Sequence, residues 1–488
     1  MKLRLVIILV WIVLISLLVS RNLFIPDVNT DISATLAQAR ETSFYGIWFK
    51  NRRIGYVENN VHPKASGGFY LDQRAFLRLN VLDRVEQVDM HLAANLDSRQ
   101  RLEDFDFSFR APFYVLKARG KVDGHTMSFV TDTGGETRKE MAVLKDLPLI
   151  DTHHRSFLLN PVPAPGHKVK IPFFDPLSLS SRETIVEYVG QEKILIKARI
   201  YRLHHFRSSF SGVRINSWLD KNGKVIKEES PAGFIFLSEP AFKAHNIQDS
   251  GEELLSAVAV PYSGILPEKT QTTIDYRLEM PSDEAFDLDG GRQQYKDRRL
   301  RIKLEDIAAG ADSRTGGPGC GDPAAMLPSR YVQSDHPEII AQAEALMTGG
   351  GDTLKKVRFL AAWIYEHIDK RPVIGLPDAL ATLHGRKGDC NEHAALFAAL
   401  ARAAGIPARI ASGVMRHQDR FYYHAWNEVC LDGQWVSLDT TRNQLPADLT
   451  HIRLVIGDLE EQVRISTLLG KLKIKIMPWE DDEYTGNN

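Results

Sequence analysis

"KGDCNEHAALFAALARAAGIP", residues 387–407, turns from a short charged segment into a run dominated by Ala, Leu and Phe. Asp389 and Glu392 have the spacing of a capping box, and a Gly-x-Pro sequence at the end provides a stop. These signals predict a helix from about residue 390 to residue 404. Apolar residues cover nearly its whole circumference, so we expect the helix to be central and buried.

The first turn of this predicted helix contains a cysteine, Cys390. Free backbone N–H groups and the positive end of the helix dipole would point toward its sulfur. That environment is predicted to stabilise the thiolate and to hold an oxyanion that forms beside it. A buried structural cysteine is the alternative, and a neighbouring base would decide between the two interpretations.

A candidate base lies in "RFYYHAWNEVCLDGQWVSLDTTR", residues 420–442. Two alternating runs flank an Asp-Gly pair, which is a favoured two-residue hairpin turn. The register that this turn sets places Trp426 opposite Asp439. His424 lies on the same face of the predicted sheet, so His424 and Asp439 become diagonal neighbours. Together with Cys390 they supply the nucleophile, base and orienting carboxylate of a Cys-His-Asp triad.

These motifs closely resemble the transglutaminase-like superfamily of papain-related thiol enzymes over roughly residues 352–445. The matching pattern is G-x-C opening an Ala/Leu-rich helix, then H-A-W, then W-x-x-x-D. The resemblance implies a C-terminal α+β, papain-like catalytic domain. It assigns nucleophile to Cys390, general base to His424 and orienter to Asp439.

The resemblance also implies substrate contacts and a reaction. Trp426 and Trp435 match the aromatic positions around the site and are expected to bind substrate. The expected reaction is acyl transfer at an amide through a thioester, without a cofactor. Water as acceptor gives a peptidase or amidase, and an amine gives a cross-linking transglutaminase; we favour hydrolysis because water is always available. A non-catalytic envelope binding or scaffold protein is the alternative from another class.

A metal site is a weaker interpretation of the same region. His384, Asp389, Glu392 and His393 could be grouped as ligands, but the histidines fit no known zinc spacing. Glu392 is already explained by the predicted cap. We therefore expect no metal.

The N-terminus predicts a membrane segment. Lys2 and Arg4 precede "LVIILVWIVLISLLVS", residues 5–20, which contains no charge. An uncleaved anchor is favoured over a signal peptide because small residues are poorly placed for cleavage. The basic residues favour a cytoplasmic N-terminus, with the bulk of the chain in the periplasm. The substrate would then be an envelope protein or peptide, with a peptidoglycan stem peptide as one candidate.

The 488 residues are too many for one core, so several domains are expected. The chain is 43% hydrophobic and 25% charged with a formal net charge of −1, and no basic run suggests nucleic acid. Three cysteines are too few for a disulfide framework. Cys320, in a Gly/Pro-rich segment, is expected to be a bystander or a partner for Cys430. The predicted divisions are an anchor or signal segment (1–25), a connector (26–43), an antiparallel β-rich domain (44–250), an additional β module (251–307), a linker (308–330), the catalytic domain (331–478) and an acidic tail (479–488).

Overall fold

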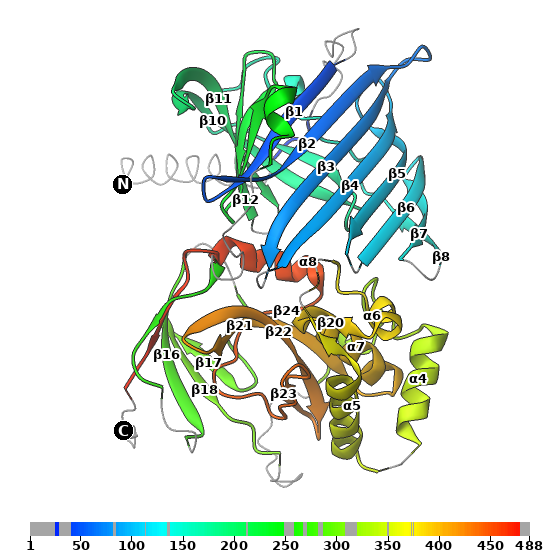
Figure 1. Ribbon diagram of the computed structural model, residues 1–488, viewed down its shortest axis with the longest axis vertical. Helices are drawn as coiled ribbons and strands as arrows, with labels where there is room; N and C mark the ends of the chain where they lie inside the picture. The colour runs from blue at the N-terminus through cyan, green and yellow to red at the C-terminus, as the bar shows by residue number, and fades with distance from the viewer. Residues whose placement is uncertain are drawn as a thin grey trace, which may run out of the picture.

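The computed structural model contains two lobes, a large β domain and a mixed α/β domain, one above the other in Figure 1. It describes residues 25–28, 41–81, 84–112, 114–133, 137–210, 213–247, 258–266, 271–281, 286–307, 320–348, 351–371, 373 and 375–478. The predicted anchor sequence, residues 5–20, and the acidic tail, 479–488, lie outside these residues. Within them, no helix is long and apolar enough to cross a membrane.

The β domain is a single sheet of fourteen strands among the described residues, in the order β8-β7-β6-β5-β4-β3-β2-β1-β14-β13-β12-β11-β10-β9. All of its strand pairs are antiparallel. The predicted large antiparallel domain is therefore confirmed. The strands are β1 (Glu41–Phe49), β2 (Arg52–Pro63), β3 (Phe69–Val81), β4 (Arg84–Leu96), β5 (Leu102–Ala111), β6 (Tyr114–Asp123), β7 (Thr126–Asp132), β8 (Thr137–Val143), β9 (Lys168–Asp175), β10 (Ser180–Ile196), β11 (Arg199–Phe210), β12 (Val213–Leu219), β13 (Val225–Glu229) and β14 (Phe234–Glu239).

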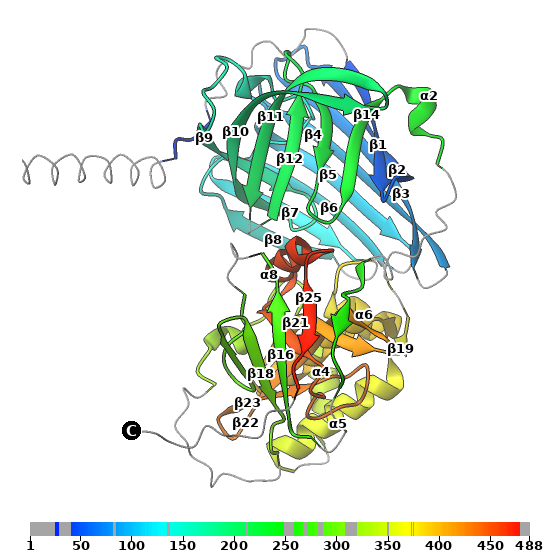
Figure 2. The ribbon, with the colours of Figure 1, turned by 90° about the vertical axis from the view of Figure 1, so that its left-hand side faces the viewer.

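This sheet folds back on itself. Figure 2 shows β9–β14 lying across β1–β8, with the two halves facing each other. Tyr45 and Ile47 from the first half pack with Val186 and Phe206 from the second in one buried cluster. Alternating inward apolar residues on both halves explain the closure, because each half can bury its apolar face only against the other. Two short helical turns, η1 (Ser156–Leu158) and α2 (Ala241–Ala244), accompany the sheet.

The second lobe combines helices with three smaller sheets. Its four-stranded sheet has the order β23-β22-β21-β24. The helices are α4 (Pro337–Met347), α5 (Thr353–His367), α6 (Ala379–Gly385), α7 (Cys390–Ala403) and α8 (Leu459–Gln462), with shorter turns η2 (Pro323–Ala325) and η3 (Val463–Leu468). The strands are β15 (Tyr262–Ser263), β16 (Thr273–Glu279), β17 (Gln293–Lys296), β18 (Arg299–Lys303), β19 (Asp369–Lys370), β20 (Lys387–Gly388), β21 (Ala408–His417), β22 (Arg420–Leu431), β23 (Gln434–Leu438), β24 (Ile452–Ile456) and β25 (Lys473–Ile476).

The segment predicted as an additional β module is tied to the end of the chain. Strands β15–β18 share a five-stranded sheet with β25, in the order β15-β25-β16-β18-β17. Short strand β25 carries only four residues, so its pairing partners could not be read from its own pattern. Strands β15–β18 thus pack as part of the C-terminal lobe.

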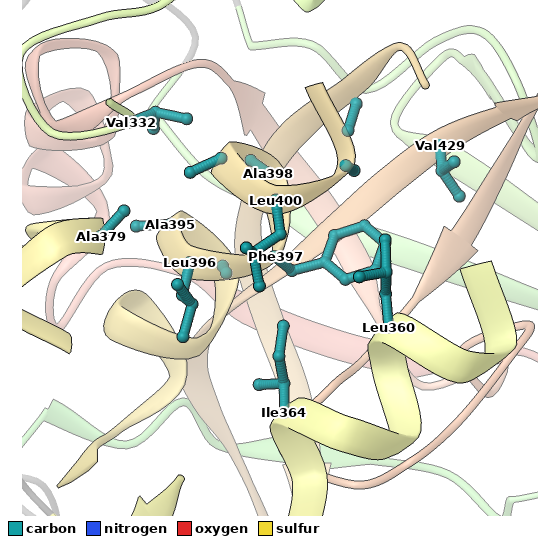
Figure 3. Packing of buried hydrophobic residues seen from close by; sticks show 14 of the residues in the cluster. Val332, Leu360, Ile364, Ala379, Ala395, Leu396, Phe397, Ala398, Leu400 and Val429 are labelled. Atoms are coloured by element: carbon teal, nitrogen blue, oxygen red, sulfur yellow. The ribbon is translucent and has the colours of Figure 1, made fainter. Parts of the chain in front are cut away.

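Helix α7 is the centre of the C-terminal lobe, as its apolar circumference predicts. It begins at Cys390, ends at Ala403 and carries both hydrogen bonds of the capping box. Figure 3 shows Phe397 and Leu400 of this helix meeting Leu360 and Ile364 of α5. Burial on all sides fixes the helix, and with it the position of the first turn that holds the cysteine.

The two lobes share apolar and polar contacts. Tyr331 and Leu376 of the C-terminal lobe belong to a buried cluster formed mainly by the β domain. The Tyr331 hydroxyl donates to the Leu177 carbonyl oxygen at 3.0 Å. Arg330 donates to the Ser178 carbonyl oxygen and pairs with Glu140. These contacts dock the β domain on the loop segments that precede α4 and α6.

Cys320 and Cys430 form a disulfide, with their Cα atoms 5.9 Å apart. Of the two expectations for Cys320, the pairing with Cys430 is the one the structure shows. The bond joins the segment before η2 to strand β22, so it closes a large part of the C-terminal lobe into one loop.

Reduction of this disulfide is expected to lower the free energy of unfolding by about 2–4 kcal/mol, because the unfolded chain regains the freedom of a long loop. The bridge spans 110 residues of sequence. Urea unfolding of the native protein with and without a phosphine reductant measures the change. A Cys320→Ala, Cys430→Ala protein is the control and should not respond to reductant. Equal stability of the native protein in both conditions would contradict the expectation.

Candidate active site

The N-terminus of α7 holds Cys390 through a tightly built cap. The Asp389 side chain accepts from the Asn391 N–H at 3.1 Å, and Glu392 Oε2 accepts from the Asp389 N–H at 3.0 Å. A Cβ atom on Gly388 would lie 2.3 Å from the Glu392 Cβ atom, so only glycine leaves room for this cap. The G-x-C pattern therefore has a steric cause next to the cysteine.

Cys390 is half-buried and is the one free cysteine of the chain. The backbone of Ala425, the residue after His424, favours the thiolate of Cys390 and acts to lower the pKa of the thiol. Burial and the negative charge of Asp389, joined by Glu392 and Asp439, raise the pKa of the thiol well above its usual value. Burial and the acidic cap thus oppose the helix dipole at this sulfur, so a neighbouring base is needed to favour the thiolate.

Removing the negative charge of Asp389 should make the thiol more acidic. Asn also caps helices well, so Asp389→Asn keeps the acceptor and removes only the charge. We expect Cys390 to be alkylated about threefold to tenfold faster at pH 7. The reason is that one nearby negative charge raises the pKa of a thiol by about 0.5 or more. Timed alkylation followed by intact mass measures the rate. Asp352→Asn, at the N-cap of α5, is the matched control. An unchanged rate in Asp389→Asn would show that this charge does not act on the sulfur.

The hairpin of β22 and β23 has the predicted register. Leu431 pairs with Gln434 and Cys430 with Trp435 across the turn. Asp432 and Gly433 both have positive φ, 49° and 79°, as the favoured two-residue turn requires. This register carries Asp439, just beyond β23, to the side chain of His424.

His424 and Asp439 meet directly. The Nε2 atom of His424 lies 2.9 Å from the Oδ2 atom of Asp439. The His424 side chain is 9% exposed and that of Asp439 is 1% exposed, so solvent scarcely competes for the contact. Because Nε2 is committed to the carboxylate, Nδ1 is the nitrogen left for a proton from the thiol. The structure thus brings together the base and the orienting carboxylate of the sequence-based triad.

Asp439 is held as a carboxylate by donors on both oxygens. Its Oδ1 atom accepts from the N–H and the hydroxyl of Thr441, at 2.8 and 2.6 Å. Its Oδ2 atom meets His424 and also the Nε2 atom of His451, at 3.1 Å. Burial would raise the pKa of Asp439, but the charges and hydrogen bonds of the two histidines outweigh it and hold that pKa well below its usual value.

Two residues of this site were missed by sequence reasoning. His451 is fully buried, and its second ring nitrogen, Nδ1, lies 3.0 Å from Asp448 Oδ1. Both residues lie in the irregular segment between β23 and β24, where no periodic pattern indicates which side chains turn inward. A histidine directly before the apolar run of β24 was the one available signal.

The two tryptophans expected to contact substrate pack at different points along the hairpin. Trp426 is 2% exposed and is enclosed between rings, stacked on His424 and edge-on to His451. Trp435 pairs with Cys430, six residues along β22 from His424 and hence about 20 Å away. Its ring is covered by the Arg409 guanidinium, 4.0 Å away. Trp426 thus packs against His424, and Trp435 packs at the far end of the hairpin, while substrate binding by these two side chains stays a prediction.

The side chains of the alternative metal site in the sequence have other hydrogen-bond partners. His384 pairs with Glu338, and the Nδ1 atom of His393 contacts the Asp389 carbonyl oxygen. Among the described residues, His424, Asp439 and His451 form the one group whose ligand atoms lie within 4.8 Å of one another. We interpret that group as hydrogen-bonded, because each imidazole already meets the carboxylate at a hydrogen-bond distance.

Residues 340–440 match the family model of the transglutaminase-like superfamily. The matched region runs from α4 to just past β23, and it contains Cys390, His424 and Asp439. The C-terminal lobe therefore contains a transglutaminase-like domain, as the sequence resemblance predicted. No curated protein matches the chain.

Several solved structures are similar to parts of the chain. A candidate cysteine protease from Cytophaga hutchinsonii is 19% identical, with 41% of this chain and 83% of that chain covered at a TM-score of 0.26. The periplasmic domain of TgpA from Pseudomonas aeruginosa, bound to ethylmercury, is 18% identical, with coverage of 36% and 74% and a TM-score of 0.25. A β-barrel-like protein from Brucella abortus, of a domain of unknown function, is 12% identical, with coverage of 42% and 96% and a TM-score of 0.32. TM-scores this low do not by themselves establish a shared fold.

Proposed function

We propose that this protein is a thiol enzyme that transfers acyl groups from carboxamides or peptide bonds, with Cys390 as nucleophile, His424 as general base and Asp439 as the group that orients the base. The observation that carries the proposal is the contact between His424 Nε2 and Asp439 Oδ2, at 2.9 Å. The backbone of Ala425, the residue after His424, acts to lower the pKa of Cys390, which supports a sulfur close to this part of β22. The match of residues 340–440 to the transglutaminase-like superfamily supports the same class.

The proposed first half-reaction forms a thioester. Nδ1 of His424 takes the thiol proton while the sulfur attacks the carbonyl carbon, and the carbonyl oxygen becomes an oxyanion near the N-terminus of α7. When the tetrahedral intermediate collapses, the carbon–nitrogen bond breaks and His424 returns the proton to the leaving amine. Asp439 holds the imidazole in the tautomer that leaves Nδ1 free.

The second half-reaction returns the enzyme to its starting state. A water molecule gives a proton to His424 and attacks the thioester, and the carboxylic acid leaves as the sulfur regains a proton. Hydrolysis is our proposed outcome, because water reaches any site that admits an acyl donor. Burial and nearby carboxylates raise the pKa of Cys390, so the proposed reaction depends on His424 to take the thiol proton.

We further propose an extracytoplasmic location with an uncleaved N-terminal anchor, and an envelope protein or peptidoglycan stem peptide as substrate. The disulfide between Cys320 and Cys430 supports an oxidising compartment. The charge-free run of residues 5–20 after two basic residues supports the anchor. Alkaline extraction of membranes followed by peptide mass spectrometry tests both points. Recovery of the chain in the soluble fraction without residues 1–25 would show that the segment is cleaved.

One incubation experiment distinguishes hydrolysis from cross-linking. The full chain is mixed with a glutamine-containing peptide or a peptidoglycan stem peptide, with and without a primary amine, and products are weighed by mass spectrometry. We expect the hydrolysed product in both mixtures and none with Cys390→Ser. Amine incorporation in preference to hydrolysis would assign a transglutaminase instead. Turnover that survives in Cys390→Ser would overturn the proposed nucleophile.

A further inference from the structure

A buried histidine lies between two carboxylates behind the proposed triad. His451 is fully buried; its Nε2 atom lies 3.1 Å from Asp439 Oδ2, and its Nδ1 atom lies 3.0 Å from Asp448 Oδ1. Neither the thiol nor a substrate needs this side chain in the reaction described above. The ring nevertheless shares the Asp439 Oδ2 atom with the proposed base, so two hydrogen bonds through one oxygen connect the two imidazoles.

The protons in this arrangement can be assigned. Asp448 Oδ1 also accepts from the N–H and hydroxyl of Thr450, at 2.9 and 2.6 Å, and Oδ2 accepts from Gln444. Burial would raise the pKa of Asp448, but His451 and Thr450 outweigh it and lower that pKa. Both carboxylates are therefore ionised acceptors, and both nitrogens of His451 must donate. A ring that donates twice is an imidazolium.

The surroundings of His451 agree with a positive charge. Burial alone would lower its pKa, but the hydrogen bonds and charges of Asp439 and Asp448 outweigh burial and raise it. The other charged or titratable groups that face it are His424, with ring centroids 5.7 Å apart, and Arg292, whose guanidinium reaches the His451 carbonyl oxygen at 3.4 Å. Two anions thus offset the cationic ring and the more distant guanidinium.

We propose that His451 is a positioning residue, a buried imidazolium that fixes Asp439 Oδ2 and shares the negative charge of this oxygen with His424. The inference rests on the proposed function, since it concerns the same base. Sharing the carboxylate weakens its hold on a proton at His424, so the imidazole can return that proton to the leaving amine. The hydrogen bond also prevents Asp439 from rotating away from the base.

Hydrogen bonds from a residue distant in sequence fix the segment that contains His451. Arg292, just before β17, donates to the carbonyl oxygens of Ala447 and Asp448 and to the Ser437 hydroxyl. Its guanidinium also pairs with Glu305 at 3.1 Å. The five-stranded sheet therefore has a role at the site, because it supports the segment that presents His451.

The test follows histidine protonation by ¹⁵N magnetic resonance in the full chain, with EDTA present. In the native protein both ring nitrogens of His451 should carry protons at pH 7. In His451→Gln the pH at which the His424 ring loses its proton should rise by about one to two units, as expected for the loss of a charge about 6 Å away. Asp448→Asn should let His451 lose its proton and move His424 in the same direction by less. His336→Gln, which alters another buried histidine of this lobe, should move neither.

The outcomes separate this inference from the proposed function. A neutral His451 ring in the native protein, or a His424 titration unchanged in His451→Gln, would overturn the positioning role. If His451→Gln does not fold, the His451 signals of the native protein and of Asp448→Asn test the positioning role instead. The role then requires a doubly protonated ring in the native protein that loses a proton in Asp448→Asn. Alkylation of Cys390 is measured in parallel, in native protein and in His424→Ala. Equal rates there would overturn the proposed function, and the positioning role with it, whereas a fast native rate with an unchanged His424 titration overturns the positioning role alone.

Discussion

Replacing His424 with alanine is expected to slow alkylation of Cys390 at pH 7 by about 100-fold and to lower acyl-transfer turnover by on the order of 10⁴-fold. Burial and the charge of Asp389 raise the pKa of Cys390, which opposes formation of the reactive thiolate. A neighbouring base that takes the thiol proton should therefore speed the reaction. His424 precedes Ala425, whose backbone acts on the pKa of Cys390.

Timed alkylation with iodoacetamide and intact mass spectrometry measures this effect. Cys320 and Cys430 are joined in a disulfide, so the added mass reports Cys390 alone. His336→Gln is the matched control, since it alters a buried histidine of the same lobe that caps α4. A rate in His424→Ala equal to that of the control would mean that His424 does not activate the thiol.

Replacing Glu428 with glutamine is expected to lower the free energy of unfolding by about 3–5 kcal/mol, because it leaves the buried Arg453 and the partly buried Arg409 without their anionic partner. Glu428 lies on β22 and pairs with Arg453 at 2.7 Å and Arg409 at 2.6 Å. Burial would raise the pKa of Glu428, but the two guanidinium groups outweigh it and lower that pKa. The ion cluster is therefore charged at neutral pH.

Arg453 also connects strand β24 to another part of the C-terminal lobe. Its guanidinium also donates to the carbonyl oxygens of Asp287, Asp289 and Gly290, which joins the four-stranded sheet to the segment before β17. Urea unfolding measures the loss. Glu366→Gln, at an exposed position on α5, is the control and should change stability by less than about 0.5 kcal/mol. Equal stability of the Glu428→Gln and control proteins would refute a structural role for the cluster.

Local signals predicted the part of the site that depends on short stretches of sequence. The capping box at Asp389 and the Gly-x-Pro stop gave both ends of α7 within a residue. The Asp-Gly turn gave the register that brings His424 to Asp439. Such predictions succeed because a cap and a two-residue turn are decided by neighbours in sequence.

The remaining features depend on contacts between distant segments. His451 and Asp448 lie in an irregular segment whose path is set by Arg292, more than a hundred residues earlier in the chain. The burial of Trp426 follows from the same packing, because His451 lies against its ring. The effect of Asp389 on the thiol required the burial of Cys390, which a motif does not give. The fourteen-stranded sheet likewise folds onto itself through contacts between its two halves, which the sequence of one strand does not indicate.

In the proposed reaction, the sulfur of Cys390 carries the acyl group between donor and acceptor. The most direct test is to incubate the native full chain with a peptide substrate, quench in acid and locate the added acyl mass by peptide mass spectrometry. We predict a thioester on Cys390 that is released by hydroxylamine, that forms far more slowly in His424→Ala and that is absent in Cys390→Ser. Substrate turnover by the native protein with no acyl adduct on Cys390, or with the adduct on another residue, would contradict the account.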